Sequence, residues 1–216
     1  MEIRKSFHQQ LDELYRDLLK MANTAVETTE KTRAAFAALD PQQAQSIIDD
    51  DDVIDQFVQS IEEVGIELLA RQAPVAIDLR TIIMIMRVAQ HLERVGDLCV
   101  NISKAIVNLE GYTISAWIQE NMDEMFQRSI KMMVRAMEAF KERDVVKAKE
   151  LSKMDDTVDR INRTFLTSYD KDSEEELELT IRVVMISRFI ERIADHAVDI
   201  GENVSYMVTG EFVEFS

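Results

Sequence analysis

The sequence predicts an all-α protein made of two pseudo-symmetric three-helix bundles, that is, six long antiparallel helices. Three observations support this prediction: apolar residues recur at steps of three and four, helix breakers are few, and two acidic motifs each occur twice. The chain has 216 residues with only five glycines and two prolines. No stretch shows the sustained alternation of a strand, and long helices joined by short connections favour antiparallel neighbours.

Six helical segments of roughly 25–37 residues are expected, because the residues that start or stop helices divide the chain into six. Aspartate and serine are good N-cap residues, and proline is favoured at the first helical position. Proline and glycine elsewhere mark the ends of segments. In chain order, the boundaries are Asp40-Pro41, Ala73-Pro74, Gly111, Asp144, the capping-box pair Ser173 and Glu176, and Gly210.

The apolar residues of each segment define one face of a helix. In the third segment they recur at helical spacing from Ile85 to Ile106, and in the last segment from Ile181 to Val204. This period is typical of amphipathic helices that bury one face against their neighbours. Cys99 lies on the apolar face of the third segment, so we expect it in the core.

The two halves of the chain repeat. Asp51 to Asp55 in the second segment matches Asp155 to Asp159 in the fifth, at an offset of 104 residues (155 minus 51). Glu93 to Asp97 in the third segment matches Glu191 to Asp195 in the sixth, at an offset of 98 (191 minus 93). The smaller second offset fits a shorter connection in the second half. The predicted domains are therefore two three-helix bundles, residues 1–110 and 111–216.

Each repeated motif places two carboxylates four residues apart on one helical face, where like charges destabilise a helix by about 0.2–0.5 kcal/mol. A single such pair is most simply a solvated face, because the chain is rich in acidic residues. The repetition in equivalent helices suggests that a cation offsets the repulsion, and a salt-bridged acidic groove is the alternative. Asn101 and Asp199 extend the two rows by one more step. The candidate metal ligands are Asp51, Asp55, Glu93, Asp97, Asn101, Asp155, Asp159, Glu191, Asp195 and Asp199.

An all-oxygen ligand set suits hard cations such as Mg²⁺, Mn²⁺, Ca²⁺ or iron. None of the three histidines lies three residues after a glutamate, so the Glu-x-x-His motif of ferritin-like di-iron proteins is absent. We interpret His91 and His196 as groove or surface residues rather than ligands. Arg94 and Arg192 follow the two glutamates. We interpret them as partners in helix-surface salt bridges, and pairing with an anion held by the metals is the alternative. Gly96 in mid-helix suggests close packing or the approach of a ligand.

Composition excludes several classes of function. The net charge of −16 disfavours binding to nucleic acid and direct docking on anionic lipid. Cys99 is the only cysteine, so a reducing cytoplasm is the simplest location. The N-terminal residues lack the apolar core of a signal peptide, and the longest aliphatic run, Ile82 to Met86, is too short to span a bilayer. No Gly-rich phosphate loop or nucleophile–base pair is visible, so we predict that the chain is not an enzyme.

Two specific patterns point to a known family. One is Ala-Arg-Gln-x-Pro-x-Ala-x-Asp-Leu-Arg at residues 70–80, and the other is Glu-Arg-(Ile/Val)-(Gly/Ala)-Asp, which occurs in both halves. With these patterns the chain resembles the PhoU family of phosphate-transport regulators over nearly its whole length. The matching stretches are Asp51 to Asp55, Leu69 to Arg80, Leu92 to Asp97, Asp155 to Asp159, Ile190 to His196 and Tyr206 to Glu211.

The resemblance implies a fold of two pseudo-symmetric bundles and a negative regulator of phosphate uptake and of phosphate-starvation signalling. It implies two partners, the ATPase of the phosphate ABC transporter and a sensor histidine kinase, and it implies a homodimer. It also implies metal at the paired acids, either multinuclear iron clusters or divalent ions such as zinc, manganese or magnesium. Because Asn101 stands where the second half has Asp199, the two sites would differ in charge. A carboxylate-bridged iron oxidoreductase and a metal-free helical adaptor are the alternatives.

Overall fold

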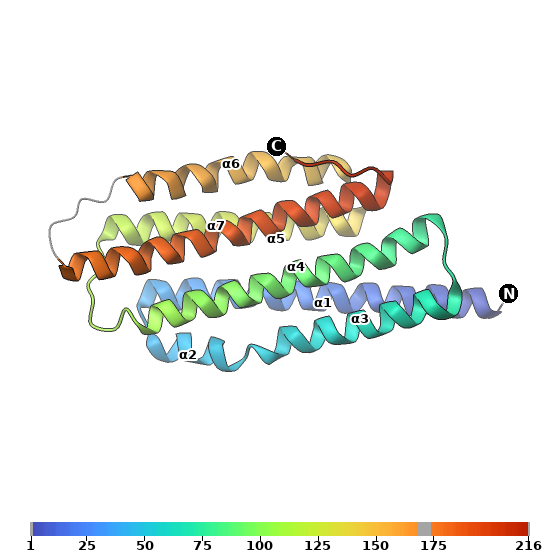
Figure 1. Ribbon diagram of the computed structural model, residues 1–216, viewed down its shortest axis with the longest axis horizontal. Helices are drawn as coiled ribbons and strands as arrows, with labels where there is room; N and C mark the ends of the chain where they lie inside the picture. Colours follow the sequence, from blue (N-terminus) through green and yellow to red (C-terminus); the bar gives the residue numbers. More distant parts are fainter. Residues whose placement is uncertain (1, 168–173, 216) are drawn as a thin grey trace.

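The computed structural model describes residues 2–167 and 174–215 and confirms the all-α fold, since none of these residues lies in a strand. The helices of the described part run along the long axis of an elongated molecule (Figure 1). The capping box predicted from Ser173 and Glu176 lies outside the described side chains. The helices are α1 (Glu2–Ala38), α2 (Pro41–Asp49), α3 (Asp52–Gln72), α4 (Ala76–Val107), α5 (Ala116–Glu142), α6 (Val145–Thr167) and α7 (Glu174–Thr209).

The helices form two bundles that lie side by side. The first bundle contains α1 to α4 and the second contains α5 to α7 (Figure 1). The bundles meet chiefly through α4 and α7, which run in opposite directions and pack together more extensively than any other pair of described helices. Helix α1 also packs against α5. Among the described helices, none is at once long and apolar enough to cross a bilayer.

The predicted second segment is divided into two helices, which corrects the expectation of one continuous helix there. Helix α2 ends at Asp49 and α3 begins at Asp52. Four consecutive aspartates occupy positions 49–52. Aspartate has low helix propensity but is favoured at helix N-termini, where its charge complements the helix dipole. In the second half, α6 runs without a break through Asp155, so the two halves differ at this point.

The other predicted helix boundaries agree with the structure. The Asp40 carboxylate accepts hydrogen bonds from two backbone N–H groups at 2.9 and 3.1 Å, and the Asp144 carboxylate accepts two at 2.8 and 3.1 Å. These bonds satisfy N–H groups that the first turn of a helix leaves unpaired. Gly111 lies between α4 and α5 with a φ of +86°, and Gly210 follows α7 with a φ of +79°. Both glycines adopt a left-handed conformation that side chains disfavour.

The buried apolar residues form one continuous cluster with members from both bundles. At its centre the Thr29 hydroxyl of α1 lies 3.5 Å from the Cys99 sulfur of α4 and 3.9 Å from the Met133 sulfur of α5. Cys99 therefore lies in the core, as predicted. The division of the chain into domains 1–110 and 111–216 stays a prediction, because the core does not separate at that point.

Cys99 is expected to react very slowly with thiol reagents in the native protein. Burial raises the pKa of its thiol to about 11, whereas a free cysteine has a pKa of about 8.5 and reacts as the thiolate. At pH 8 we expect labelling with a disulfide reagent to be at least about 100-fold slower than for a free thiol. The same protein in denaturant should react fully and serves as the control. Rapid native labelling would contradict the buried position.

Candidate metal centres

The structure brings four of the predicted acids together in the first bundle. Asp51 precedes α3 and Asp55 lies in its first turn, while Glu93 and Asp97 lie one turn apart on α4; we call these residues the first acidic quartet. Burial raises the pKa of the Glu93 carboxyl, and the charge of Asp97 raises it further. Burial also raises the pKa of Asp51, with added repulsion from Asp55 and Asp97. The carboxyls of Asp51 and Glu93 are thus affected by acidic neighbours on both sides of the α3–α4 contact.

The equivalent acids of the second bundle also meet. Asp155 and Asp159 of α6 lie close to Glu191 and Asp195 of α7, and these form the second acidic quartet. Burial raises the pKa of Asp155 to about 7, assisted by repulsion from the other three carboxylates. Burial is also the main reason that the pKa values of Glu191 and Asp195 are raised. Glu191 is 7% exposed, so this quartet is set deeper than a solvated charged face.

Arginines neutralise part of each quartet. Arg94 lies 2.8 Å from an oxygen of Asp97 and 3.3 Å from an oxygen of Glu93, which confirms the predicted helix-surface salt bridge. In the second quartet the arginine that pairs with Glu191 is Arg188, one turn before it on α7. The predicted pairing of Arg192 is not found among the described ion pairs. Arg163 also pairs with Asp159 of the second quartet at 3.0 Å. Four carboxylates against one paired arginine in the first quartet and two in the second leave both with an excess of negative charge.

The second quartet fits a cation better than the first. Asp155 Oδ1 is buried and has no hydrogen-bond partner among the described atoms, although buried carboxylate oxygens are normally paired. A hard cation would satisfy this oxygen and relieve the repulsion. Among the described residues, however, neither quartet brings three oxygens within 4.8 Å of one another. Binding would therefore require carboxylate side chains to rotate inward.

Gly96 serves close packing between the helices of the first quartet. A Cβ atom at this position would lie 3.0 Å from Cδ1 of Ile54 on α3. Gly96 also lines a cavity of about 220 Å³ that includes Asp51 and Lys31. The glycine thus brings α4 close to the start of α3 and to its acids.

The two outer candidates, Asn101 and Asp199, have different surroundings. Asn101 is exposed on α4. Asp199 lies beside two histidines: its Oδ2 is 3.3 Å from Nδ1 of His196 and 3.5 Å from Nδ1 of His91. A hydrogen bond from His196 lowers the pKa of Asp199. Its charge still contributes to the raised pKa of Asp195, so it lies next to the second quartet rather than in its centre.

The grouping of His91, His196 and Asp199, here called the histidine cluster, was not anticipated from the sequence. The two histidines are 105 residues apart, and their Nδ1 atoms lie 3.2 Å from each other. The internal repeat gives no indication of this contact, because its offset of 98 residues places Leu98 opposite His196 and Phe189 opposite His91. The spacing of His196 and Asp199 on one helical face was the one local signal.

The match to a known domain covers both bundles. The PhoU domain matches residues 18–106 and residues 122–204, one match in each half of the chain. The chain belongs to the PhoU family. The resemblance inferred from the two sequence patterns is thus confirmed.

Related proteins match over almost their whole length. The phosphate-specific transport system accessory protein PhoU homolog of Clostridium acetobutylicum is 34% identical over 221 residues, covering 99% of both chains. PhoU homolog 1 of Thermotoga maritima is 30% identical and covers 95% of this chain and 90% of its own. These names describe accessory proteins rather than enzymes, in agreement with the predicted non-enzymatic class.

Two crystal structures share the fold. The phosphate transport system regulatory protein PhoU of Streptococcus pneumoniae superposes with a TM-score of 0.87 at 29% identity, covering 96% of this chain and 99% of its own. PhoU of Pseudomonas aeruginosa gives the same TM-score and identity, covering 95% and 100%. The arrangement of two helical bundles is therefore shared with PhoU proteins from two bacteria.

Proposed function

We propose that this chain is a non-enzymatic, metal-binding negative regulator of phosphate uptake and of phosphate-starvation signalling. It acts in the cytoplasm, as a homodimer, through contact with the ATPase of the phosphate ABC transporter and with a sensor histidine kinase. Membership of the PhoU family, whose relatives are named as transport accessory and regulatory proteins, supports the regulatory role. The unpaired buried oxygen of Asp155 is the observation that most supports metal binding.

The carboxylates of each quartet hold a cation between two helices of one bundle. Asp51 and Asp55, at the start of α3, would rotate their carboxylates toward Glu93 and Asp97 of α4, and the second quartet repeats this between α6 and α7. A bound cation supplies the positive charge that offsets carboxylate repulsion and that lets an acidic protein accept phosphate. Arg94 and Arg188 hold three of the carboxylates in place.

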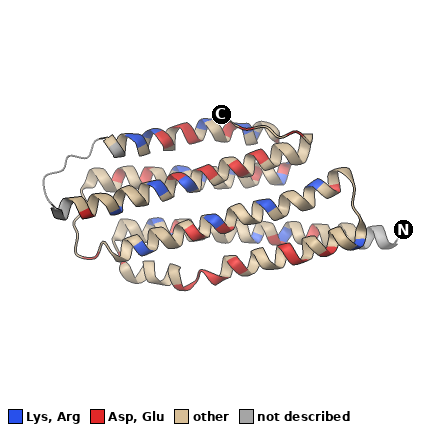
Figure 2. Ribbon diagram, in the orientation of Figure 1, with Lys and Arg blue, Asp and Glu red and all other residues tan. Residues whose placement is uncertain are grey.

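An acidic stripe is the surface proposed to face basic partners. Residues 41–70, which include α2 and all of α3 except its last two residues, contain eight acidic residues and no Lys or Arg. Figure 2 shows these acidic residues along one edge of the molecule. Charge complementarity of this kind sets the rate and specificity of association more than the affinity. We therefore expect the interaction with the transporter ATPase to weaken as ionic strength rises.

Metal binding is tested by elemental analysis of gently purified protein. The test variant replaces Glu93, Asp97, Glu191 and Asp195 by Ala, and the control replaces Glu138 and Glu142, an exposed acidic pair four residues apart on α5. We expect at least about one metal equivalent per bundle in the wild type and in the control, and its loss in the test variant. Absence of metal from all three proteins after loading with iron, zinc or manganese would refute the metal-binding part.

Phosphate sensing is tested separately by calorimetry. If the proposed role is right, phosphate binds the metal-loaded protein and not the metal-free protein, because only the former offers positive charge at the quartets. Equal, weak binding to both forms would show that the quartets do not respond to phosphate. The metal sites would then be structural.

A metal-free helical adaptor is the second candidate, favoured by two features of the first quartet. Arg94 already pairs with Glu93 and Asp97, and no three oxygens of the quartet converge. In that case Glu93→Ala with Asp97→Ala would leave the free energy of unfolding unchanged or slightly higher, since repulsion is relieved. Thermal unfolding of this variant, with and without added metal, separates the two candidates.

A further inference from the structure

We propose that the histidine cluster is a third cation site, distinct from the acidic quartets, that selects a divalent transition metal of the zinc type. Its ligands would be Nδ1 of His91, Nδ1 of His196 and Oδ2 of Asp199. The site lies where α4 meets α7, so a cation bound there joins the two bundles. The proposal is independent of the metal binding proposed for the quartets.

The spacing of the three atoms matches three corners of a tetrahedral zinc site. The Nδ1 atoms are 3.2 Å apart, and Oδ2 of Asp199 lies 3.3 and 3.5 Å from them. A tetrahedron with metal–ligand bonds of about 2.0–2.2 Å has edges of roughly 3.3–3.6 Å. Neighbouring ligands of an octahedral Mg²⁺ site would lie closer, at roughly 2.8–3.0 Å. The triangle therefore fits the tetrahedral case, with one corner open for water.

The ligand chemistry separates this cluster from the quartets. Two imidazole nitrogens and one carboxylate oxygen suit Zn²⁺ and its neighbours in the first transition row, whereas all-oxygen sites suit Mg²⁺, Mn²⁺ or Ca²⁺. Two histidines and one carboxylate with an open fourth position form a known type of zinc ligand set. Among the described residues, this cluster alone brings three such atoms within 4.8 Å of one another.

The orientation of the two rings fits this ligand set. Nδ1 of His91 and Nδ1 of His196 both face Oδ2 of Asp199. Nε2 of His196 is buried without a partner, which leaves Nδ1 as the nitrogen that faces the other two ligands.

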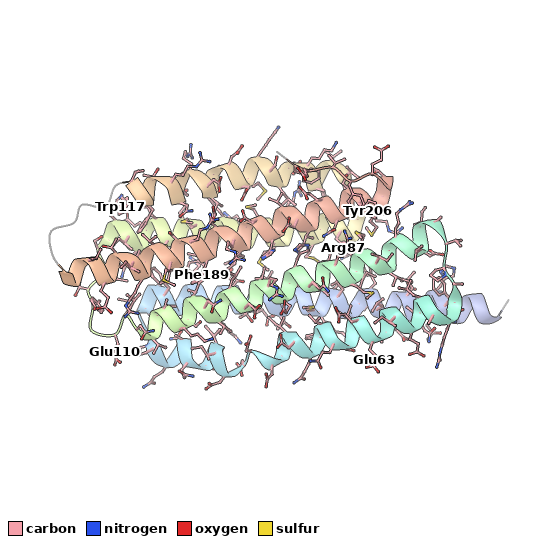
Figure 3. The ribbon with its side chains drawn as sticks, viewed as in Figure 1. Glu63, Arg87, Glu110, Trp117, Phe189 and Tyr206 are labelled. Atoms are coloured by element: carbon pink, nitrogen blue, oxygen red, sulfur yellow. The ribbon has the colours of Figure 1, made fainter. Side chains whose placement is uncertain are left out.

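An open cleft of about 660 Å³ gives access to the cluster. His91 and Asp199 line it together with Arg87, Glu202 and the C-terminal residues 212–214. The Phe212 ring stacks on Tyr206 and lies 5.7 Å from the guanidinium of Arg87, which holds the C-terminal segment beside the cleft. Arg87 and Tyr206 lie on α4 and α7, next to the junction of the bundles (Figure 3). A hydrated cation can therefore reach the cluster from solvent.

A cation in this site would stabilise the association of the two bundles. His91 comes from α4, and the other two ligands come from α7. A ligand that binds the folded state and not the unfolded chain raises the melting temperature. We therefore expect Zn²⁺ to raise the melting temperature of the metal-free protein in a way that depends on His91.

The experiment is a Zn²⁺ titration of metal-free protein in excess Mg²⁺, followed by calorimetry and by the visible spectrum of Co²⁺ as a zinc substitute. The test variants are His91→Asn and His196→Gln, and the matched control is His8→Asn, because His8 is exposed on α1. Asp155→Asn with Asp159→Asn disables the second quartet and leaves the cluster intact. Thermal unfolding of each metal-free variant checks its fold.

We expect one tight Zn²⁺ equivalent and a tetrahedral Co²⁺ spectrum in the wild type, in His8→Asn and in the quartet variant. Either cluster variant should lose this equivalent or bind it at least about 100-fold more weakly. Unchanged Zn²⁺ binding in a folded His91→Asn protein would overturn the proposal. Loss of the tight equivalent in the quartet variant would instead assign the zinc to the second acidic quartet.

Discussion

Expressed alone, residues 1–110 are expected to be helical but to lack cooperative thermal unfolding. Within the run from Leu92 to Val100 on α4, six residues are buried. A helix that packs on a single layer buries a stripe about 100° wide, whereas α4 packs against α1, α2 and α3 on one side and against α7 on the other. Removal of the second bundle exposes the side of α4 that contacts α7.

Removal of the second bundle also takes away part of the core that the first bundle packs against. Thr29 of the first bundle contacts Met133 of the second, and Tyr15 of α1 stacks on Phe140 of α5 at 5.6 Å between ring centroids. A chain that keeps its secondary structure but loses such fixed packing has the properties of a molten globule. We expect strong far-UV circular dichroism, weak near-UV signals and binding of a hydrophobic dye. Calorimetry should show no sharp transition.

The full chain is the control, and a mixture of fragments 1–110 and 111–216 should recover part of the cooperative transition if the two bundles recognise each other. A sharp transition in fragment 1–110 alone, near the melting temperature of the full chain, would contradict this expectation. It would establish the two-domain division that the internal repeat suggests.

Local signals account for what the sequence predicted well. The caps at Asp40 and Asp144 act within one turn of their helices, and the apolar period of α4 depends only on its own residues. The acidic quartets could be anticipated because each helix places two of the four carboxylates, and the internal repeat indicates which helices pair. The family patterns at residues 70–80 are similarly local.

Features that depend on how helices meet could not be derived in this way. The contact between His91 and His196 exists only because α4 packs on α7 at one particular register. The break before α3 was missed because the repeat suggested that both halves behave alike, although the four aspartates at positions 49–52 were a local sign of a helix start. That Glu191 pairs with Arg188 rather than with Arg192 could not be predicted either, because it depends on the positions of the side chains.

Replacing Asp155 by asparagine is expected to stabilise the metal-free protein at pH 8 and to have little effect at pH 4. The pKa of Asp155 is about 7 in the folded protein, against an ordinary value of 3.8. Between these two pH values the folded state retains a proton that the unfolded chain has lost, so stability falls as pH rises. Above pH 7 the carboxylate is charged in both states and its full destabilisation remains.

The full pKa shift of Asp155 would correspond to about 4 kcal/mol in the free energy of unfolding. Because the side chain is only partly buried and solvent screens its charge, we expect Asp155→Asn to stabilise the protein by about 1–2 kcal/mol at pH 8. Denaturant unfolding of both proteins at pH 4 and pH 8 measures the difference. Asp156→Asn is the control, because Asp156 is adjacent and exposed, and it should change stability by less than about 0.5 kcal/mol at either pH.

The raised pKa of Asp155 also makes metal binding at the second quartet depend on pH. A cation at the second quartet must displace the proton of Asp155, so apparent affinity should fall roughly 50-fold between pH 7 and pH 5 if this proton is the only competitor. In the Asp155→Asn variant this part of the pH dependence of metal affinity disappears, because the amide has no proton to lose between pH 5 and pH 7. If Asp155→Asn is instead less stable than the wild type at pH 8, the carboxylate is favourably paired in the folded state. The raised pKa and the argument for a cation would then both fail.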